Sequence, residues 1–386
     1  MKLCFLCNEY PPVPHGGIGS VVQVVGRAMV QAGHQVRVVG AYRQSEPERT
    51  EHDHGVEVFR LKIPEWRLGW TAARYRLFTK VADWARRGEI DMVEVPDYQG
   101  WAAGWGRLPV PVLARLHGSS TYFAAEMGWK NDPFGFCLEW ASLRRCDFVG
   151  STSRYTAERT RDLFKSKNSV DAILYNPVDL PEVAPTKARS RSQVVFTGTL
   201  NSKKGVLSLI RAWPTVTQAC PSSELHMFGK DTLTQDGRSM AGYLASMLNG
   251  DRASVHFHGH TSRENLLENL KTPRVAVFPS YAEAFAMAPL EAMAHGCPTI
   301  YSRRGSGPEL MDDGRDGLLI DPDQPQDIAN AIIRVLRDDE LAAQLGQAGR
   351  RRVAESFSVP VILARNEAFY FSCIREFKRR INSKPA

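Results

Sequence analysis

The sequence lacks a long apolar run. Every window of about 18 residues contains a charged side chain, which excludes a membrane-spanning helix of ordinary length. The amino-terminal residues offer one lysine and a short apolar run before the chain turns polar, too little for a secretory signal. We therefore expect a soluble protein in the cytoplasm.

Cysteine is scarce and irregularly spaced. Seven thiols are an odd number without framework spacing, which excludes a disulfide scaffold and is typical of reduced, buried cysteines. Cys4 and Cys7 form a Cys-x-x-Cys motif inside a strand-like run, whereas redox motifs lie at a helix start and zinc sites need a second ligand pair. We predict structural thiols there.

No charge of one sign dominates. The 49 basic and 42 acidic residues give a net charge of +7 that is spread over both halves, so no nucleic-acid-binding domain is expected. The 17 phenylalanines, 11 tyrosines and 8 tryptophans exclude a disordered chain. A length of 386 residues exceeds the roughly 250–300 that one core usually supports, which predicts two domains.

What the sequence does contain is an alternation of buried β-type runs and amphipathic helical runs, which occurs twice. Residues 176–193 interrupt it with three prolines and predict a linker. Strands are expected at 2–7, 35–40, 56–61, 91–95, 111–116, 147–150 and 171–175, then at 194–198, 224–228, 254–258, 274–279, 298–301 and 317–320. Helices in the first half are expected at about 20–32, 71–87 and 153–166, and an amphipathic helix with a basic end covers 358–381. The pattern predicts two doubly wound α/β domains, which bind ligands at the carboxyl ends of their strands.

A glycine-containing loop follows the first strand of each half. Gly16 and Gly17 precede a helix, but Val22 replaces the third glycine of a dinucleotide fingerprint, so a ligand loop and a plain tight turn both remain open. In the second half, Lys203 and Lys204 stand beside a predicted helix start and suit a pyrophosphate; a solvated surface loop is the alternative.

The segment 279–298 carries the strongest signal. Glu283 lies in a loop after a strand, and Glu291 lies about two turns into the following helix. Two carboxylates flanking free helix N–H groups can hold sugar hydroxyls while the backbone holds phosphate, although acids near a helix start are also common caps.

Two further patterns are better explained by structural roles than by binding sites. His256, His258 and His260 alternate along a strand end and share a face, but no further ligand follows nearby in the sequence, so a structural role is favoured over a metal site. Residues 60–87 form a basic, aromatic-rich stretch with an amphipathic helix. A docked helix with a solvated face is favoured over contact with an anionic membrane or acceptor.

Together these motifs resemble the retaining glycosyltransferases of family 4. Such enzymes have the GT-B fold, in which two Rossmann-like domains face each other across a cleft. The resemblance covers nearly the whole chain, and its core is the Glu-x7-Glu element of Glu283 and Glu291. Supporting pieces are the YPPxxxGG loop ending at Gly17, the His117-Gly118 pair, the junction 175–179, Lys204-Gly205 and the stretch 305–320 with Glu309.

The resemblance implies a domain plan and a role for each matching residue. An acceptor-side domain would cover 1–178, a donor domain 179–357, and a final segment 358–386 would pack back on the first domain. The donor-binding residues implied are Gly16, Gly17, Thr199, Lys204, Glu283, Phe285, Ala286, Met287 and Glu291. Lys204 would bind the pyrophosphate, Glu291 the ribose hydroxyls and Glu283 the sugar hydroxyls. His117, Glu283 and Lys204 are the implied catalytic residues, with His117 beside the reacting carbon.

One position departs from the family. The family usually has an arginine that binds diphosphate where this chain has Thr199. The missing charge-assisted contact is worth roughly 1.5–3 kcal/mol unless another cation, such as Lys203, Arg303 or Arg304, replaces it.

The function that the resemblance implies is transfer of a hexose from a nucleotide sugar, with uridine diphosphate as the expected carrier, to a saccharide or lipid-linked saccharide. A catalytically weak nucleotide-sugar-binding protein is the alternative, suggested by Thr199. No metal and no cofactor are expected, because no Asp-x-Asp carboxylate pair lies near the phosphate loops. The expected location is cytoplasmic, and peripheral contact at the inner membrane face through residues 60–87 is an alternative that stays open.

Overall fold

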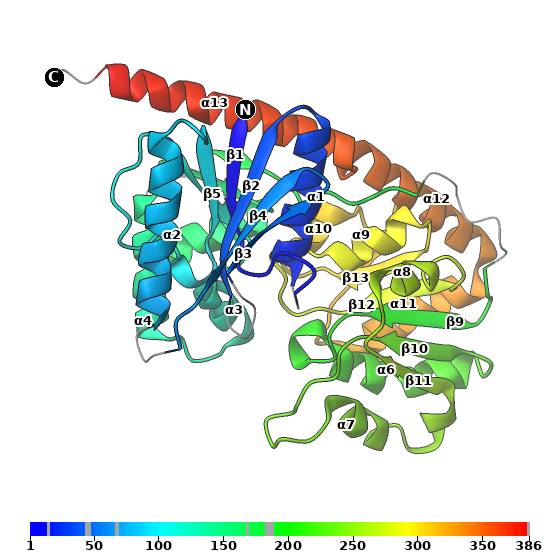
Figure 1. The fold of residues 1–386 in the computed structure, drawn as a ribbon. Coiled ribbons are helices and arrows are strands. Elements are labelled where there is room, and N and C mark those ends of the chain that lie inside the picture. Colours follow the sequence, from blue (N-terminus) through cyan, green and yellow to red (C-terminus); the bar gives the residue numbers. More distant parts are fainter. Residues whose placement is uncertain (14–15, 43–47, 66–68, 167–169, 182–188, 384–386) are drawn as a thin grey trace. The chain divides into compact units, whose positions relative to one another are not determined.

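The structure is a computed structural model that describes residues 1–13, 16–42, 48–65, 69–166, 170–181 and 189–383 (Figure 1). Contacts between residues divide the chain into two compact units. Unit 1 comprises Met1–Pro177 together with Val359–Ala386, and unit 2 comprises Val178–Ser358. Each unit has its own sheet and its own buried apolar core.

Unit 1 contains a sheet with the strand order β3-β4-β2-β1-β5-β6-β7-β8. Neighbouring strands are parallel, except that β3 runs antiparallel to β4. The strands are β1 (Lys2–Leu6), β2 (Gln35–Tyr42), β3 (Arg49–Asp53), β4 (Val56–Lys62), β5 (Met92–Pro96), β6 (Val112–Leu116), β7 (Phe148–Ser151) and β8 (Ala172–Ile173). The strand order reverses between β1 and β5, so the residues that follow these strands lie at the topological switch point.

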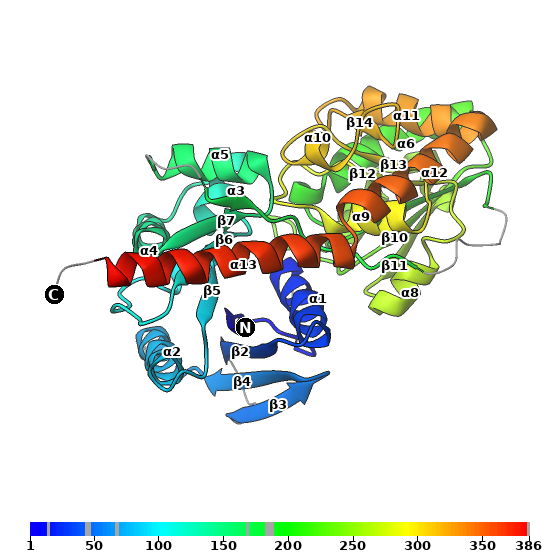
Figure 2. The ribbon, with the colours of Figure 1, turned by 90° about the horizontal axis from the view of Figure 1, so that it is seen from above.

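Helices cover both faces of this sheet (Figure 2). They are α1 (Gly17–Gln31), α2 (Gly69–Arg86), the 3-10 helix η1 (Tyr98–Gly100), α3 (Ser120–Met127), α4 (Pro133–Arg145), α5 (Arg154–Leu163) and α13 (Val359–Asn382). Leu77 of α2 packs in one core with Cys4 and Leu6, whereas Tyr370 of α13 contacts Phe5. Because successive side chains of a strand point to opposite faces, α2 and α13 cover opposite sides of the sheet.

A buried polar network fastens the carboxyl-terminal helix to unit 1. Arg115 on β6 donates to both carboxylate oxygens of Glu94 on β5 at 2.9 Å each. From α13, Asn366 accepts a hydrogen bond from Arg115 at 2.6 Å, and the Tyr370 hydroxyl donates to Glu94 at 2.7 Å. The expected return of the last helix to the first domain is thus confirmed, and charged partners as well as apolar packing hold it.

Unit 2 contains a parallel sheet with the strand order β11-β10-β9-β12-β13-β14, the order of a dinucleotide-binding fold. Its strands are β9 (Gln193–Thr197), β10 (Glu224–Phe228), β11 (Val255–Gly259), β12 (Val275–Phe278), β13 (Thr299–Ser302) and β14 (Leu318–Ile320). Its helices are η2 (Ser202–Lys204), α6 (Val206–Ala219), α7 (Met240–Ser246), η3 (Asn249–Ser254), α8 (Arg263–Glu268), α9 (Met287–Ala294), α10 (Gly307–Leu310), α11 (Pro325–Arg337) and α12 (Asp339–Ser356). The switch point here lies between β9 and β12.

The predicted α/β class and each predicted strand are confirmed, and the structure adds elements that the sequence pattern did not indicate. β3 is a polar edge strand without apolar alternation. The segment 119–135, which lies outside the predicted helices, contains α3 and the start of α4, whose amino ends are capped by the side chains of Ser119 and Asp132. The predicted linker includes 182–188, and the first glycine loop includes Pro14 and His15, which lie outside the described residues.

Two predictions about composition can be checked directly. Cys4 and Cys7 are buried, and burial raises the pKa of both thiols to about 12, which confirms structural thiols rather than a redox pair. Within the described ranges, no helix combines the length and the apolar character that a membrane crossing requires.

Candidate functional site

The turn after β9 brings two lysines to the carboxyl end of a central strand of unit 2. It contains η2, and the Asn201 side chain caps this short helix by accepting a hydrogen bond from the backbone N–H of Lys204 at 3.1 Å. Gly205 has a φ of +70°, and a Cβ there would lie 1.8 Å from the carbonyl oxygen of Pro279. Glycine is therefore required for the turn to approach the loop that follows β12.

Lys203, Lys204 and Glu283 form a compact charged cluster where these two loops meet. The Lys204 ammonium forms an ion pair with the Glu283 carboxylate, which is 12% exposed. The backbone N–H of Tyr281 donates to the Lys203 carbonyl at 2.7 Å and ties the loops together. Burial alone raises the pKa of Glu283, but the ammonium groups of Lys204 and Lys203 outweigh it and hold the pKa below its usual value. The cluster therefore combines an ionised carboxylate with two cations and keeps a net positive charge.

The helix after the β12 loop begins at an alanine. The N-cap residue of α9 is Ala286, whose side chain makes no capping hydrogen bond. Phe285 precedes it and is buried, with its ring centroid 5.9 Å from that of Phe357. Because β9 and β12 are parallel neighbours, this helix start and the lysine turn lie at the same edge of the sheet. Backbone N–H groups and nearby ammonium groups are the donors that a phosphate prefers.

Glu291 has a different partner. It lies on α9 and is 12% exposed. Its carboxylate forms an ion pair with Arg263, with 2.9 Å between Glu291 Oε1 and Arg263 Nη2. Arg263 begins α8 and also lies 4.0 Å from Asp179. Burial, opposed by Arg263, raises the pKa of Glu291. A carboxylate with this partner is an acceptor for hydroxyl groups, and Arg263 is a cation that the sequence patterns did not single out.

Lys203 and Lys204 lie in the same turn as Thr199, the position of the missing family arginine. Thr199 follows β9 and is half-buried in the turn that carries Lys203. Of the other two proposed substitutes, Arg303 donates to the Leu319 carbonyl at 2.8 Å and Arg304 pairs with Asp323. Lys203 is therefore the replacement that the geometry favours.

In unit 1, a carboxylate accepts a hydrogen bond from the start of α1, directly after the glycine loop. Gly16 is the N-cap residue of α1, and Gly17 is its first residue. The Glu9 side chain accepts a hydrogen bond from the backbone N–H of Gly19 at 2.8 Å. Among the described residues, none lies within 4 Å of a Cβ placed on Gly17. The negative charge already at this helix start opposes an incoming anion.

His117 follows β6 and lies beside a buried acid. Its backbone N–H donates to Asp97 Oδ1 at 2.8 Å. Burial, helped by the charge of Arg115, lowers the pKa of His117 to about 3, so the imidazole is neutral at pH 7. Asp97 follows β5 and is 1% exposed; burial raises its pKa to about 7. Its Oδ2 has no hydrogen-bond partner among the described residues.

The basic stretch 60–87 contains β4 residues and α2. Leu77, Val81 and Trp84 are buried in the core of unit 1, and the ammonium of Lys80 lies 5.1 Å from the Trp84 ring centroid. These contacts are those of a docked helix. Trp66 lies outside the described residues.

Sequence reasoning missed three charged residues of these regions: Glu9, Asp97 and Arg263. Asp97 had a usable signal, because it comes directly after a buried strand at the predicted ligand edge. Glu9 and Arg263 had none, since each reaches its partner only through the folded arrangement of loops.

Comparisons with known proteins agree with the geometry. A family model described as Glycosyltransferase Family 4 matches residues 15–182, and a second, Glycosyl transferases group 1, matches residues 183–352. A glycogen synthase of Mycobacterium tuberculosis is 25% identical over 97% of this chain and 95% of its own length.

Two solved structures share the fold. Sucrose-phosphate synthase of Thermosynechococcus elongatus is 23% identical with a TM-score of 0.81, over 97% of this chain and 99% of its own. HepE of Anabaena in complex with UDP-glucose is 19% identical with a TM-score of 0.71, over 96% of this chain and all of its own. The two family matches adjoin without a gap, and each unit contains a sheet whose strands are parallel, apart from the β3–β4 pair. The chain belongs to the group 1 glycosyl transferases of glycosyltransferase family 4 and has the GT-B fold.

Proposed function

We propose that the protein is a retaining hexosyltransferase that uses a uridine diphosphate sugar as donor and a saccharide or lipid-linked saccharide as acceptor, in polysaccharide or glycoconjugate biosynthesis. The observation that carries this proposal is the Lys203–Lys204–Glu283 cluster beside the start of α9, where the N-cap residue is Ala286. The cluster joins cations for a diphosphate to a carboxylate for sugar hydroxyls. The complex of the related HepE with UDP-glucose supports the choice of donor.

Each candidate residue in unit 2 then has a role. Lys204, with Lys203 in place of the family arginine at Thr199, holds the diphosphate. The backbone from Phe285 through Ala286 to Met287 binds phosphate and sugar at the helix start. Glu283 accepts hydrogen bonds from the transferred sugar, and Glu291 accepts them from the ribose.

In unit 1 we assign donor-phosphate contacts to the backbone of Gly16 and Gly17 and the donor-sugar contact to His117. The neutral imidazole of His117 suits a hydrogen bond with an uncharged hydroxyl near the reacting carbon. In the proposed mechanism the acceptor oxygen forms a bond to that carbon on the face from which the diphosphate leaves, and the leaving phosphate oxygen takes the acceptor proton. The protein supplies position and charge, and no side chain acts as an obligatory nucleophile.

We further propose that transfer requires neither a metal ion nor a cofactor, because lysine ammonium groups and a helix start carry the diphosphate charge. Excess EDTA should leave the transfer rate unchanged. A loss of activity that only added Mg²⁺ or Mn²⁺ restores would overturn this part of the proposal.

A catalytically weak nucleotide-sugar-binding protein is the second candidate, and Thr199 is the observation that favours it. Purified protein should be screened against UDP-, GDP- and ADP-sugars by thermal shift, and the best donor then incubated with and without saccharide acceptors. Donor consumption with transfer of the sugar supports the enzyme. Donor binding without hydrolysis or transfer supports the binding protein, and no stabilisation by any donor contradicts both.

We keep a cytoplasmic location and peripheral membrane contact through residues 60–87 as proposals. Exchanging Arg76, Lys80 and Arg87 for Gln should lower binding to vesicles containing anionic lipid and leave donor binding unchanged. If the unaltered protein does not bind such vesicles, α2 is only a docked helix.

A further inference from the structure

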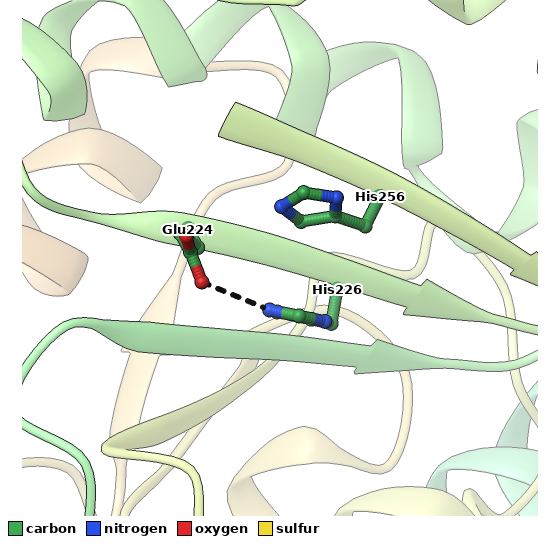
Figure 3. A group of neighbouring side chains, drawn as sticks. All are labelled: Glu224, His226 and His256. Atoms are coloured by element: carbon green, nitrogen blue, oxygen red, sulfur yellow. Dashed lines mark hydrogen bonds and ion pairs between the residues drawn. The ribbon is translucent and has the colours of Figure 1, made fainter. Parts of the chain in front are cut away.

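A group of histidine and glutamate side chains lies on β10 and β11, apart from the candidate donor cluster (Figure 3). The strands are parallel, and His226 stands opposite His256 in their register. Leu225, Met227 and Val255 point into the apolar core, so the alternate residues Glu224, His226, His256 and His258 share the other face. β11 is the edge strand of this sheet.

The ligand atoms of Glu224, His226 and His256 all lie within 4.8 Å of one another. His226 Nε2 and Glu224 Oε2 are 3.4 Å apart. Two ligand atoms of a tetrahedral zinc ion with metal–ligand bonds of about 2.0–2.1 Å are separated by about 3.3 Å, so this pair already has the spacing that zinc requires. Figure 3 shows the His256 ring on β11 beside the Glu224–His226 pair on β10.

A second contact fixes the orientation of the central ligand. His226 Nδ1 lies 2.9 Å from His258 Nε2, and the His258 ring stacks on Phe228 with centroids 4.2 Å apart. When the Nδ1–H of His226 donates to His258, the lone pair of Nε2 points toward Glu224. Metal-binding histidines commonly have their other ring nitrogen held in this way.

The donor set favours one class of ion. Imidazole nitrogens and a single carboxylate suit zinc and its neighbours among the transition metals, whereas magnesium and calcium prefer oxygen ligands.

We propose that Glu224, His226 and His256 bind one divalent transition-metal ion of the zinc class, which joins the edge strand β11 to β10. This site is separate from the proposed transfer reaction. Its role is to hold the exposed edge of the unit 2 sheet, which has no strand beyond β11.

Tag-free protein, stripped with EDTA and then dialysed, tests the proposal by calorimetric titration with ZnCl₂ and by thermal melting. We expect one zinc ion per chain and a rise in Tm of about 5–10 °C at a zinc concentration about 100 times Kd. MgCl₂ should give neither effect. No saturable zinc binding, or equal stabilisation by magnesium, overturns the site.

Matched variants locate the ion. His226→Gln and His256→Gln should each raise the zinc Kd by about 100-fold or more, while His260→Gln, a change at an exposed histidine beyond β11, should alter it by less than about threefold. Glu224→Gln changes an exposed ligand with little risk to folding, and should weaken zinc binding by about tenfold. Equal losses in the His260 variant and the ligand variants would refute the assignment. Donor binding by the stripped protein is measured in parallel, so that failure of the metal site and failure of the proposed function remain distinct.

Discussion

Glu283 of unit 2 and Asp97 of unit 1 are buried carboxylates in opposite electrostatic environments. In unit 2, Glu283 is paired with Lys204 and its pKa is held below the usual value. In unit 1, Asp97 and Glu9 receive hydrogen bonds from backbone N–H groups, and burial raises the pKa of Asp97 to about 7. Both units share the strand–turn–helix order of a doubly wound sheet, yet among the described residues of these two turns the lysines lie in unit 2.

This difference teaches that one topology does not make one kind of site. The end of a parallel sheet supplies a place where loops meet, and the charges on those loops decide what binds. A diphosphate is attracted to Lys203 and Lys204, whereas the start of α1 already carries the Glu9 carboxylate. We therefore expect the unit 2 turn to dominate donor affinity, and the following changes test that view.

The largest effect should come from removing the charge of Asp97. Because its pKa in the folded protein lies above the unfolded value near 4, the folded state binds the proton more tightly and stability falls as pH rises from about 4 to above 7. The expected cost at pH 8 is about 4 kcal/mol, at 1.36 kcal/mol for each pKa unit between about 4 and about 7. Asp97→Asn should make the free energy of unfolding depend less steeply on pH. Urea unfolding at pH 5, 6.5 and 8 measures this slope.

The quantity to compare is the change of the unfolding free energy with pH and not its absolute value. The buried asparagine amide also costs desolvation energy, but this cost is the same at every pH. Asp91→Asn, at a half-buried aspartate near β5, is the control and should keep the unaltered slope. If the variant and the unaltered protein have the same pH dependence, Asp97 is ionised in the folded state and the contrast with Glu283 disappears.

Replacing Glu283 and replacing Glu291 should have different effects on sugar transfer and on nucleotide binding. Glu283→Ala removes a contact to the transferred sugar, so transfer should fall by about 10²-fold or more while nucleoside diphosphate binding stays normal or tightens slightly, because two ammonium groups lose their carboxylate. Glu291→Ala removes a contact to the ribose, which donor and product share, and should raise KM for the donor. Steady-state kinetics and calorimetry with UDP separate the two.

The opposing interpretation is that both residues only stabilise helix ends. In that case each alanine variant would lower the free energy of unfolding by at most about 1 kcal/mol and would bind and transfer normally. Such a result would remove the donor site from unit 2.

Sequence reasoning reached the fold and part of the site for a physical reason. Strand-to-loop-to-helix order and local motifs are encoded over short stretches, so Lys204, Glu283 and Glu291 were recognisable before the structure. Partnerships across strands are not local. Glu224 and His226 complete a cluster with His256 only through strand pairing, and the Arg115–Tyr370 contact joins residues 255 positions apart.

Lys204→Ala should weaken UDP binding by at least about 1.5 kcal/mol, roughly tenfold, because a charge-assisted contact is lost. Lys271→Ala, at a lysine paired with Glu268 on the surface, is the matched control and should have no effect. Thr199→Arg should tighten binding by restoring the family cation. No change in the arginine variant would mean that Lys203 already fills that space, whereas no change in the Lys204 variant would move the phosphate site elsewhere.

The smallest effect concerns the turn of unit 1. Glu9→Gln keeps a side-chain oxygen that can accept the hydrogen bond from Gly19 but removes the negative charge at the start of α1. Loss of the favourable charge–dipole interaction should lower the free energy of unfolding by about 0.3–1 kcal/mol. If the backbone of Gly16 and Gly17 binds donor phosphate, the same change should tighten UDP binding by about two- to fivefold, because the anion no longer meets a carboxylate. A thermal melt and a UDP titration on one preparation give both numbers. Lower stability with unchanged UDP affinity would show that the unit 1 turn only starts a helix, and the contrast between the units would then be complete.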